Sequence, residues 1–275
     1  MSKRNLTRKR IRVCAWLVLV LAVCGIIISG YRLLGIMQSY RLGNNNYNEL
    51  KNLVRTDTLY SPTPKIDAIS QDDEEASQIL PKLNVEIPYM AINFDALQAI
   101  NADAAAWVYC PGTVIDYPIV WGSDYVYYLS HLPDGTPNAN GTLFIDYNCT
   151  ADFSDSLTII YGHQMKSGRM FKSIGGYKKQ AYYEEHPYMY LYTAQGNYRI
   201  DIMYGCVIAV EEWVERAFVF EENLSSLLAY GAQNTTFLST VQYNQGDKVI
   251  VLSTCSFEYS GARYIVIGVL QPEYI

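Results

Sequence analysis

The chain opens with basic residues and then a long apolar run. From Val13 to Tyr31 the sequence VCAWLVLVLAVCGIIISGY continues for 19 residues without a charge. At about 1.5 Å per residue, a helix of this length comes close to the thickness of a bilayer core. The run therefore predicts a transmembrane helix. A cleaved signal peptide is the alternative, but the run exceeds the usual apolar region of about 7–15 residues, and no clear A-x-A site follows it.

The stretch after the apolar run has the pattern of a stalk and a linker. Leu50, Leu53 and Val54 recur at helical spacing and predict a stalk helix. The prolines of the segment SPTP at 61–64 cannot continue that helix. The acidic stretch at 71–77 is typical of a solvated linker.

A short helix that Asn93 would cap leads to Trp107, where the pattern changes. From there, short apolar, β-branched and aromatic runs alternate with Gly, Pro, Asn and Asp, which is typical of strands and turns. The expected strands are 107–109, 115–120, 126–129, 142–146, 157–161, 188–192, 197–210, 248–253 and 263–270. Helical spacing predicts two inserted helices, within 168–186 and 220–240. So many short strands predict a mainly β domain, either a barrel or a sandwich.

Charge is distributed unevenly along the chain. Six basic residues precede the apolar run, and only Arg32 and Arg41 follow it within the next turns. The positive-inside rule therefore predicts a single-pass protein of the cell membrane, with residues 1–12 in the cytoplasm and the body outside. Beyond residue 32 the chain carries 14 basic and 27 acidic residues. Because phosphates need clustered Lys and Arg, we expect no nucleic-acid partner.

The sequence lacks the usual signals for a cofactor or a metal. It contains no G-x-G-x-x-G, no G-x-x-x-x-G-K-[ST], no H-E-x-x-H, no G-x-S-x-G and no C-x-x-C. Its three histidines, His131, His163 and His186, are far apart and none adjoins a cysteine. We therefore expect neither a cofactor nor a metal site.

Three further cysteines lie in the body, at Cys110, Cys149 and Cys206. They are expected to be mostly buried thiols. A Cys110–Cys149 or a Cys149–Cys206 bridge stays open, because the geometry that decides between thiol and disulfide is not contained in the sequence.

Three residues near predicted strand ends form a candidate site. One strand leads to Cys255 and Arg263 opens the next, so a hairpin would bring both to one mouth of the sheet. Another strand leads to His163. A Cys thiolate, stabilised by a nearby imidazolium, is a nucleophile for acyl transfer, and the same His can then protonate a leaving amine. The planar guanidinium of an Arg, with its fork of N–H donors, can hold a substrate carbonyl or an oxyanion. A core thiol, a structural His and a rim ion pair would explain the same residues without catalysis, and spacing alone does not decide.

Two segments carry a resemblance to a known family. The segment VLSTC at 251–255, with Arg263 eight residues on, and the segment IIYGHQM at 159–165 together resemble the sortases, membrane-anchored cysteine transpeptidases of Gram-positive bacteria. The family signature is T-L-x-T-C, and this chain departs from it only at Val251. The chain looks most like class B, because of the runs at 117–120, 127–131 and 141–147, the Y-G-H-x-M form, and the helix expected before the Cys strand.

The resemblance covers about residues 85 to 275 and implies an eight-stranded sortase-type β-barrel with inserted helices. Combined with the hydropathy pattern, it divides the chain into four regions. These are a cytoplasmic tail at 1–12, a transmembrane helix at 13–31, a stalk and linker at 32–84, and a catalytic domain at 85–275.

The resemblance also implies roles for individual residues. Cys255 would be the nucleophile, His163 the general acid and base, and Arg263 the group that orients the substrate or stabilises the oxyanion. The implied reaction cleaves a C-terminal sorting-signal peptide of an exported protein and passes the acyl group to an amine of the peptidoglycan precursor. Ser253 and Thr254 are further candidates for binding the peptide, although turn chemistry explains their hydroxyls equally well.

Three other functions stay open at this stage. A pilin-polymerising sortase would use a pilin Lys as the acceptor. A membrane-tethered peptide-binding module would need no nucleophile, so the three residues together argue against it. A hydrolytic cysteine peptidase would resolve the thioester with water, and only product analysis separates it from a transpeptidase.

Overall fold

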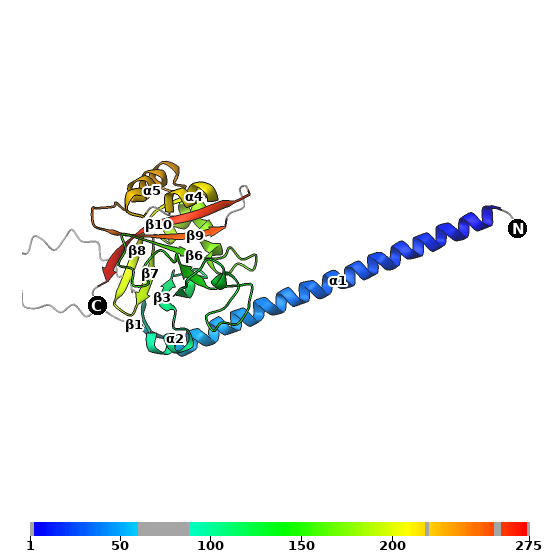
Figure 1. Ribbon diagram of the computed structural model, residues 1–275, viewed down its shortest axis with the longest axis horizontal. Coiled ribbons are helices and arrows are strands. Elements are labelled where there is room, and N and C mark those ends of the chain that lie inside the picture. The colour runs from blue at the N-terminus through cyan, green and yellow to red at the C-terminus, as the bar shows by residue number, and fades with distance from the viewer. Residues whose placement is uncertain (1–2, 60–87, 218–219, 256–259, 274–275) are drawn as a thin grey trace, which may run out of the picture.

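The computed structural model describes residues 3–59, 88–217, 220–255 and 260–273 (Figure 1). The predicted break at 61–64 and the acidic linker at 71–77 lie outside these residues. A 52-residue helix, α1 (Lys3–Val54), leads to a two-stranded antiparallel sheet of β1 (Arg55–Leu59) and β2 (Pro88–Ile92). The stalk helix therefore exists, but it ends at Val54. Residues 55–59 form a strand that the sequence pattern does not indicate.

Eight strands form a closed barrel in the order β10-β8-β7-β3-β4-β5-β6-β9 (Figure 1). They are β3 (Ala104–Tyr109), β4 (Asp116–Trp121), β5 (Leu143–Ile145), β6 (Leu157–Tyr161), β7 (Tyr188–Thr193), β8 (Asn197–Ala209), β9 (Lys248–Cys255) and β10 (Ala262–Glu273). This confirms the eight-stranded barrel and decides against the sandwich. Closure pairs each strand on both sides, which removes exposed sheet edges.

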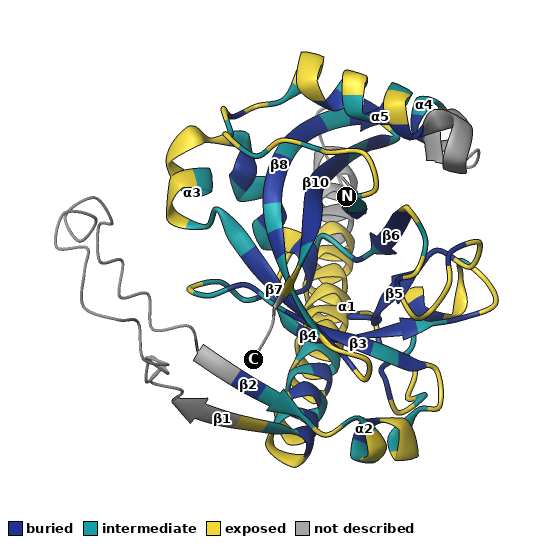
Figure 2. Ribbon diagram, turned by 90° about the vertical axis from the view of Figure 1, so that its left-hand side faces the viewer, coloured by how far each residue is buried: buried dark blue, intermediate teal, exposed yellow. Residues whose placement is uncertain are grey.

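The barrel strands are apolar on both faces because helices and long connections cover much of the outside. In β6, the four residues from Leu157 to Ile160 are all buried. Burial inside and outside the barrel explains why these runs are continuously apolar and do not alternate with polar residues. Figure 2 shows the same burial along most of β10, whereas β8 mixes buried and intermediate residues.

Helices connect the strands where the spacing indicates them. They are α2 (Phe94–Ile100), the 3₁₀ helices η2 (Tyr127–Leu129) and η3 (Phe171–Lys178), α3 (Gln180–Glu185), α4 (Val210–Ala217) and α5 (Phe220–Asn234). The side chain of Asn93 caps α2, with its Oδ1 accepting a hydrogen bond from the Ala96 amide at 3.0 Å. Both inserted helical regions are confirmed, and α4 is an additional helix at the end of β8.

The strand expected at 126–129 is wrong, because residues 127–129 form η2. The cause is the preceding Asp124, whose Oδ1 accepts hydrogen bonds from the amides of Val126 and Tyr127, both at 2.8 Å. These bonds hold the pKa of Asp124 below its usual range. A carboxylate that binds two successive amides favours a tight turn over an extended strand.

The helix α1 has two different halves (Figures 1 and 2). Among the described residues it is the one helix long and apolar enough to cross a membrane, and its described side chains from Trp16 to Gln38 are exposed. Nearer its end, Tyr47, Leu50 and Val54 are buried against the barrel. The second half therefore packs on the domain, while the first half projects away from it.

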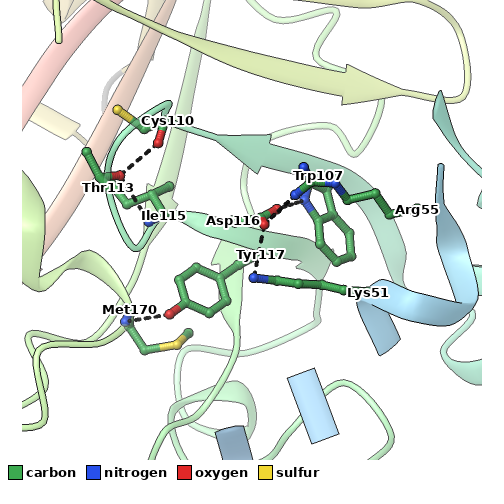
Figure 3. A network of polar contacts seen from close by, with 9 residues as sticks. All are labelled: Lys51, Arg55, Trp107, Cys110, Thr113, Ile115, Asp116, Tyr117 and Met170. Atoms are coloured by element: carbon green, nitrogen blue, oxygen red, sulfur yellow. Dashed lines mark hydrogen bonds and ion pairs between the residues drawn. The ribbon is translucent and has the colours of Figure 1, made fainter. Parts of the chain in front are cut away.

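An ionic contact fixes the end of α1 to the barrel (Figure 3). Asp116, the first residue of β4, accepts hydrogen bonds from Arg55 and from Trp107 Nε1, the latter at 2.8 Å. Its Oδ2 also lies 3.0 Å from Lys51 Nζ. Because these side chains are largely shielded from solvent, the contact is stronger than an ordinary surface ion pair.

Candidate functional site

Strand pairing brings together the three candidate residues of the sequence analysis. Strands β6 and β9 are parallel neighbours, with Tyr161 and Ser253 as Cα partners. His163 follows β6, and Cys255 ends β9, so both lie at the same edge of the barrel. The antiparallel β10 pairs Arg263 with Cys255. The structure describes the backbone of Cys255 but not its side chain.

A pocket of about 300 Å³ opens at this edge. It is lined by Tyr125, Leu129, Phe144, Tyr161, Gly162, His163, Val210, Trp213, Ser253, Thr254 and Arg263. Most of this lining is apolar or aromatic, and the few polar groups converge near the ends of β6 and β9. That composition is typical of a site that binds a peptide segment and fixes its orientation with a few hydrogen bonds. A larger hollow, of about 470 Å³, lies between α1 and residues 132–138 and contains none of the candidate residues.

The ring of His163 is held by a backbone carbonyl. Its Nε2 lies 2.6 Å from the carbonyl oxygen of Leu129. A carbonyl can only accept, so Nε2 carries a hydrogen whether the ring is neutral or charged. The nitrogen that gains and loses a proton is therefore Nδ1.

Gly162, between the end of β6 and His163, packs closely against neighbouring side chains. A Cβ added at Gly162 would lie 2.5 Å from Cδ2 of Phe171, which is too close for any other residue. The Gly162 amide donates to the carbonyl of Ser253 at 3.1 Å, which continues the pairing of β6 with β9 past the end of β6. The Y-G-H sequence thus serves close packing beneath the pocket.

The two hydroxyl residues before Cys255 have different surroundings. Thr254 is buried and its Oγ1 donates to the carbonyl of Gly162 at 2.7 Å, which fastens the end of β9 to β6. Ser253 is equally buried, yet among the described residues its Oγ has no hydrogen-bond partner. A buried hydroxyl left without a partner is costly, so the Ser253 Oγ is available to a group that enters the pocket.

A buried carboxylate beneath the pocket was not found by the sequence analysis. Asp146, just after β5, is fully buried. The hydroxyls of Tyr125 and Tyr161 donate to it at 3.0 and 2.9 Å. The amide and the side-chain nitrogen of Asn148 also donate to it, both at 3.0 Å. Four donors on one carboxylate orient the two pocket tyrosines.

These tyrosines stay protonated over the physiological range. Burial, followed by the charge of Asp146, raises the pKa of both Tyr125 and Tyr161 well above the ordinary value. Both hydroxyls therefore act as donors to Asp146. The only signal in the sequence was an Asp directly after an apolar strand, which does not by itself indicate a partner.

The other cysteines of the barrel are unsuited to nucleophilic chemistry. Cys110, Cys149 and Cys206 are buried thiols, and among the described residues they form no disulfide. Burial raises the pKa of Cys110 to about 11 and that of Cys149 to about 12. A thiol reacts as its thiolate, so these two are inert at neutral pH. The open question of a Cys110–Cys149 or Cys149–Cys206 bridge is settled in favour of thiols.

No metal centre is evident in the part of the chain that the structure describes. Within that part, no group of three or more His, Cys, Asp or Glu side chains lies close enough to hold an ion.

Comparison with known proteins gives this barrel a family. No family model matches the chain. It is 33% identical over 182 residues to Sortase B of Listeria monocytogenes, covering 63% of this chain and 72% of that protein. It is 25% identical over 168 residues to Sortase B of Staphylococcus aureus, covering 61% of this chain and 69% of that protein.

Solved structures agree on the fold. Sortase B of B. anthracis in complex with AAEK1 superposes with a TM-score of 0.67 at 23% identity, covering 86% of this chain and all of that one. The S. aureus sortase B–substrate complex has a TM-score of 0.61 at 24% identity, covering 66% and 85%. A Streptococcus pyogenes class B sortase involved in pilus biogenesis has a TM-score of 0.59 at 27% identity, covering 65% and 98%.

The closed barrel is thus that of a sortase, a transpeptidase class. The identity to the Listeria protein over most of its length narrows the assignment. This chain belongs to the sortase B family.

Proposed function

We propose that this sortase cleaves a C-terminal sorting signal of exported proteins through a thioacyl-enzyme on Cys255. It then transfers the acyl group to an amine of the cell-wall precursor. The observation that carries the proposal is the register of three strands. Cys255 and Arg263 are Cα partners in β9 and β10, and β6, which leads to His163, pairs with β9.

The reaction proceeds in two steps, acylation of Cys255 and transfer of the acyl group to the acceptor. The thiolate of Cys255 attacks the carbonyl carbon of the scissile peptide bond, the C–N bond breaks, and the leaving amine takes a proton from His163. The acceptor amine then attacks the thioester, gives a proton to His163, and the C–S bond breaks to restore the thiolate. Because the Leu129 carbonyl occupies Nε2, the proton moves through Nδ1.

Arg263 and the hydroxyl residues supply binding and charge stabilisation. The guanidinium of Arg263 lines the pocket, where its fork of donors suits a substrate carbonyl or the oxyanion of the tetrahedral intermediate. The Oγ of Ser253, which has no hydrogen-bond partner among the described residues, can bond to the bound peptide. Thr254 contributes mainly by holding the end of β9 against Gly162.

The proposed topology follows from α1. Residues 13–31 span the membrane, residues 1–12 lie in the cytoplasm, and the barrel lies outside the cell, since the basic residues cluster before the span. Residues 32–84 connect the span to the catalytic region, which extends from about residue 85 to 275. In this topology the exported substrate and its acceptor are both on the side of the barrel.

The test is intact-mass analysis of the full chain in detergent micelles. The protein is mixed with a panel of sorting-signal peptides, and then with an amine acceptor. The expected result is an acyl adduct on Cys255 that the amine releases as a new peptide bond. Release as free acid alone, even with excess amine, would favour a hydrolytic peptidase.

Three variants control this measurement. Cys255→Ala should form no adduct, and His163→Ala should form it very slowly, because an unassisted thiol and leaving group remain. His186→Ala, which removes a histidine that packs on Tyr182 outside the pocket lining, should behave like the wild type. An adduct that persists in Cys255→Ala would refute the assignment of the nucleophile.

Pilin polymerisation is a second candidate, because a class B sortase of similar fold is involved in pilus biogenesis. The two reactions share the same thioacyl-enzyme and differ only in the amine that accepts the acyl group: a pilin Lys in one, a cell-wall amine in the other. Offering both amines to the same thioacyl-enzyme and comparing the rates of release decides between them.

A further inference from the structure

The second half of α1 has two separate anchors on the barrel. The first is Asp116, which binds Lys51 and Arg55 (Figure 3). The second lies just over one helical turn before Lys51, at Tyr47, whose hydroxyl donates to the carbonyl of Gly141. Asp116 does not line the pocket, whereas Gly141 precedes the strand β5 beside it.

Tyr47 is built into this second anchor. Its side chain is 3% exposed, and its ring packs edge-on against Tyr117 with centroids 5.1 Å apart. Burial raises the pKa of the Tyr47 hydroxyl well above its ordinary value, so it remains a donor. Its oxygen also lies 3.5 Å from Oγ1 of Thr142. A membrane-proximal helix thus holds the backbone at 141–142.

The backbone at 141–142 in turn packs against η2. Gly141 has a φ of +61°, and a Cβ there would lie 2.6 Å from the Tyr128 carbonyl and 2.8 Å from the Leu129 carbonyl. The Thr142 amide donates to the Tyr128 carbonyl at 2.8 Å. Only glycine allows this approach, so Gly141 lies directly against the Leu129 peptide group.

The Leu129 carbonyl is the group that holds His163, at 2.6 Å from Nε2. The path from α1 to the candidate acid and base therefore has three short steps: Tyr47 to Gly141, Gly141 to Leu129, and Leu129 to His163. Each step is a hydrogen bond or a van der Waals contact; Tyr47 and Gly141 are buried, whereas the Leu129 side chain is exposed. A shift of the Gly141 backbone must displace the carbonyl that fixes the ring.

We propose that Tyr47 is a positioning residue for His163, and that the barrel-bound half of α1 belongs to the catalytic apparatus. The inference rests on the proposed function for its effect on turnover. Its effect on the His163 ring requires no substrate. Tyr47 acts through the Leu129 carbonyl, which fixes the hydrogen on Nε2 and leaves Nδ1 to exchange protons.

The experiment compares Tyr47→Phe with the wild type, using the full chain in detergent micelles labelled with ¹⁵N-histidine. Long-range ¹H–¹⁵N spectra report which ring nitrogen carries the hydrogen, and a His163→Gln sample assigns the signals. We expect the wild-type ring to hold its hydrogen on Nε2. In Tyr47→Phe, which keeps the ring packing but loses the hydroxyl, we expect a mixture of both tautomers.

Arg55→Gln is the matched control, because it weakens the other anchor of the same segment. It should lower the melting temperature without changing the His163 signals. Gly141→Ala tests the middle step and should disturb His163 even with Tyr47 intact. Unchanged His163 signals in Tyr47→Phe, or equal changes in Tyr47→Phe and Arg55→Gln, would overturn the proposal.

Turnover gives a second readout. Tyr47→Phe should lower kcat and shift its pH profile while KM for the peptide changes little, because the pocket wall is untouched. If neither the wild type nor any variant forms an acyl adduct with any sorting-signal peptide, the proposed function fails. The NMR comparison still decides whether Tyr47 positions His163.

Discussion

Arg263 stands directly across from Cys255, as Cα partners in the antiparallel strands β9 and β10. His163 lies two residues after Tyr161, the last residue of β6, which is the parallel neighbour of β9. The rigid register of a closed barrel thus fixes the relative backbone positions of three residues that are far apart in sequence. Functional groups placed on strands are held more precisely than groups on loops.

Replacing Arg263 with Lys should lower kcat/KM for peptide cleavage by about 10²–10³-fold, the usual loss when an oxyanion donor is removed. A Lys keeps the charge but loses the planar fork of donors. The measurement is steady-state cleavage of a fluorogenic sorting-signal peptide. Arg199→Lys is the control, since Arg199 pairs with Asp201 away from the pocket. Near-wild-type activity in Arg263→Lys would exclude an oxyanion role that depends on the fork.

Replacing Asp146 with Asn should raise KM for the peptide more than it lowers kcat. The amide cannot accept from all four donors, so Tyr125 and Tyr161 lose their fixed orientation in the pocket wall. The lost bonds should also lower the free energy of unfolding by about 1–3 kcal/mol. Asp152→Asn, at an exposed carboxylate, is the control. Equal KM values for the two variants would mean that Asp146 has no effect on the pocket.

The free energy of unfolding should fall as the pH rises above about 10. Burial raises the pKa of the Tyr177 hydroxyl above its ordinary value. The folded state therefore keeps a proton that the unfolded chain releases, so this stabilisation is complete below the unfolded pKa and declines above it. Each such tyrosine contributes a slope of about 1.4 kcal/mol per pH unit.

Urea unfolding between pH 8 and 11 measures this slope. Tyr177→Phe should make it shallower by the contribution of one proton. The wild type measured in parallel is the reference. Identical slopes for Tyr177→Phe and the wild type would show that Tyr177 titrates alike in the folded and unfolded states.

Iodoacetamide at neutral pH should modify Cys255 and leave Cys110 and Cys149 intact. The last two are buried, with pKa values raised to about 11 and about 12. Peptide mapping by mass spectrometry identifies the labelled positions, and labelling after denaturation provides the full count. Labelling of Cys149 in the folded protein at a rate similar to Cys255 would contradict its burial and raised pKa.

Local patterns in the sequence were sufficient to predict most of the barrel strands. Short apolar runs with turn residues between them mark β6, β9 and β10, because each strand is buried on both faces. The same reasoning failed at 126–129, where Asp124 binds two amides and bends an apolar segment into η2. A single polar side chain overrode a pattern of four residues.

The candidate site was only partly accessible from the sequence. Nothing local indicates that β6 and β9, about 90 residues apart, are neighbours, and the resemblance of their ends to the family supplied that link. Asp146 and Leu129 were missed for a different reason. Asp146 acts from beneath the pocket, and Leu129 contributes a backbone carbonyl, which no residue type encodes.

The continuity of α1 sets a distance. Tyr31 ends the uncharged run, and Ser39 lies eight positions further along the helix. The carbonyl of Ser39 accepts a hydrogen bond from the side chain of Asn138 in the barrel domain, at 2.9 Å. At the rise of an α-helix, the stretch from Tyr31 to Ser39 is about 12 Å of rigid rod. If residues 13–31 span the bilayer, this short rod holds the barrel close to the lipid headgroups. In the proposed reaction, a substrate would then have to offer its cleavage site close to the membrane surface.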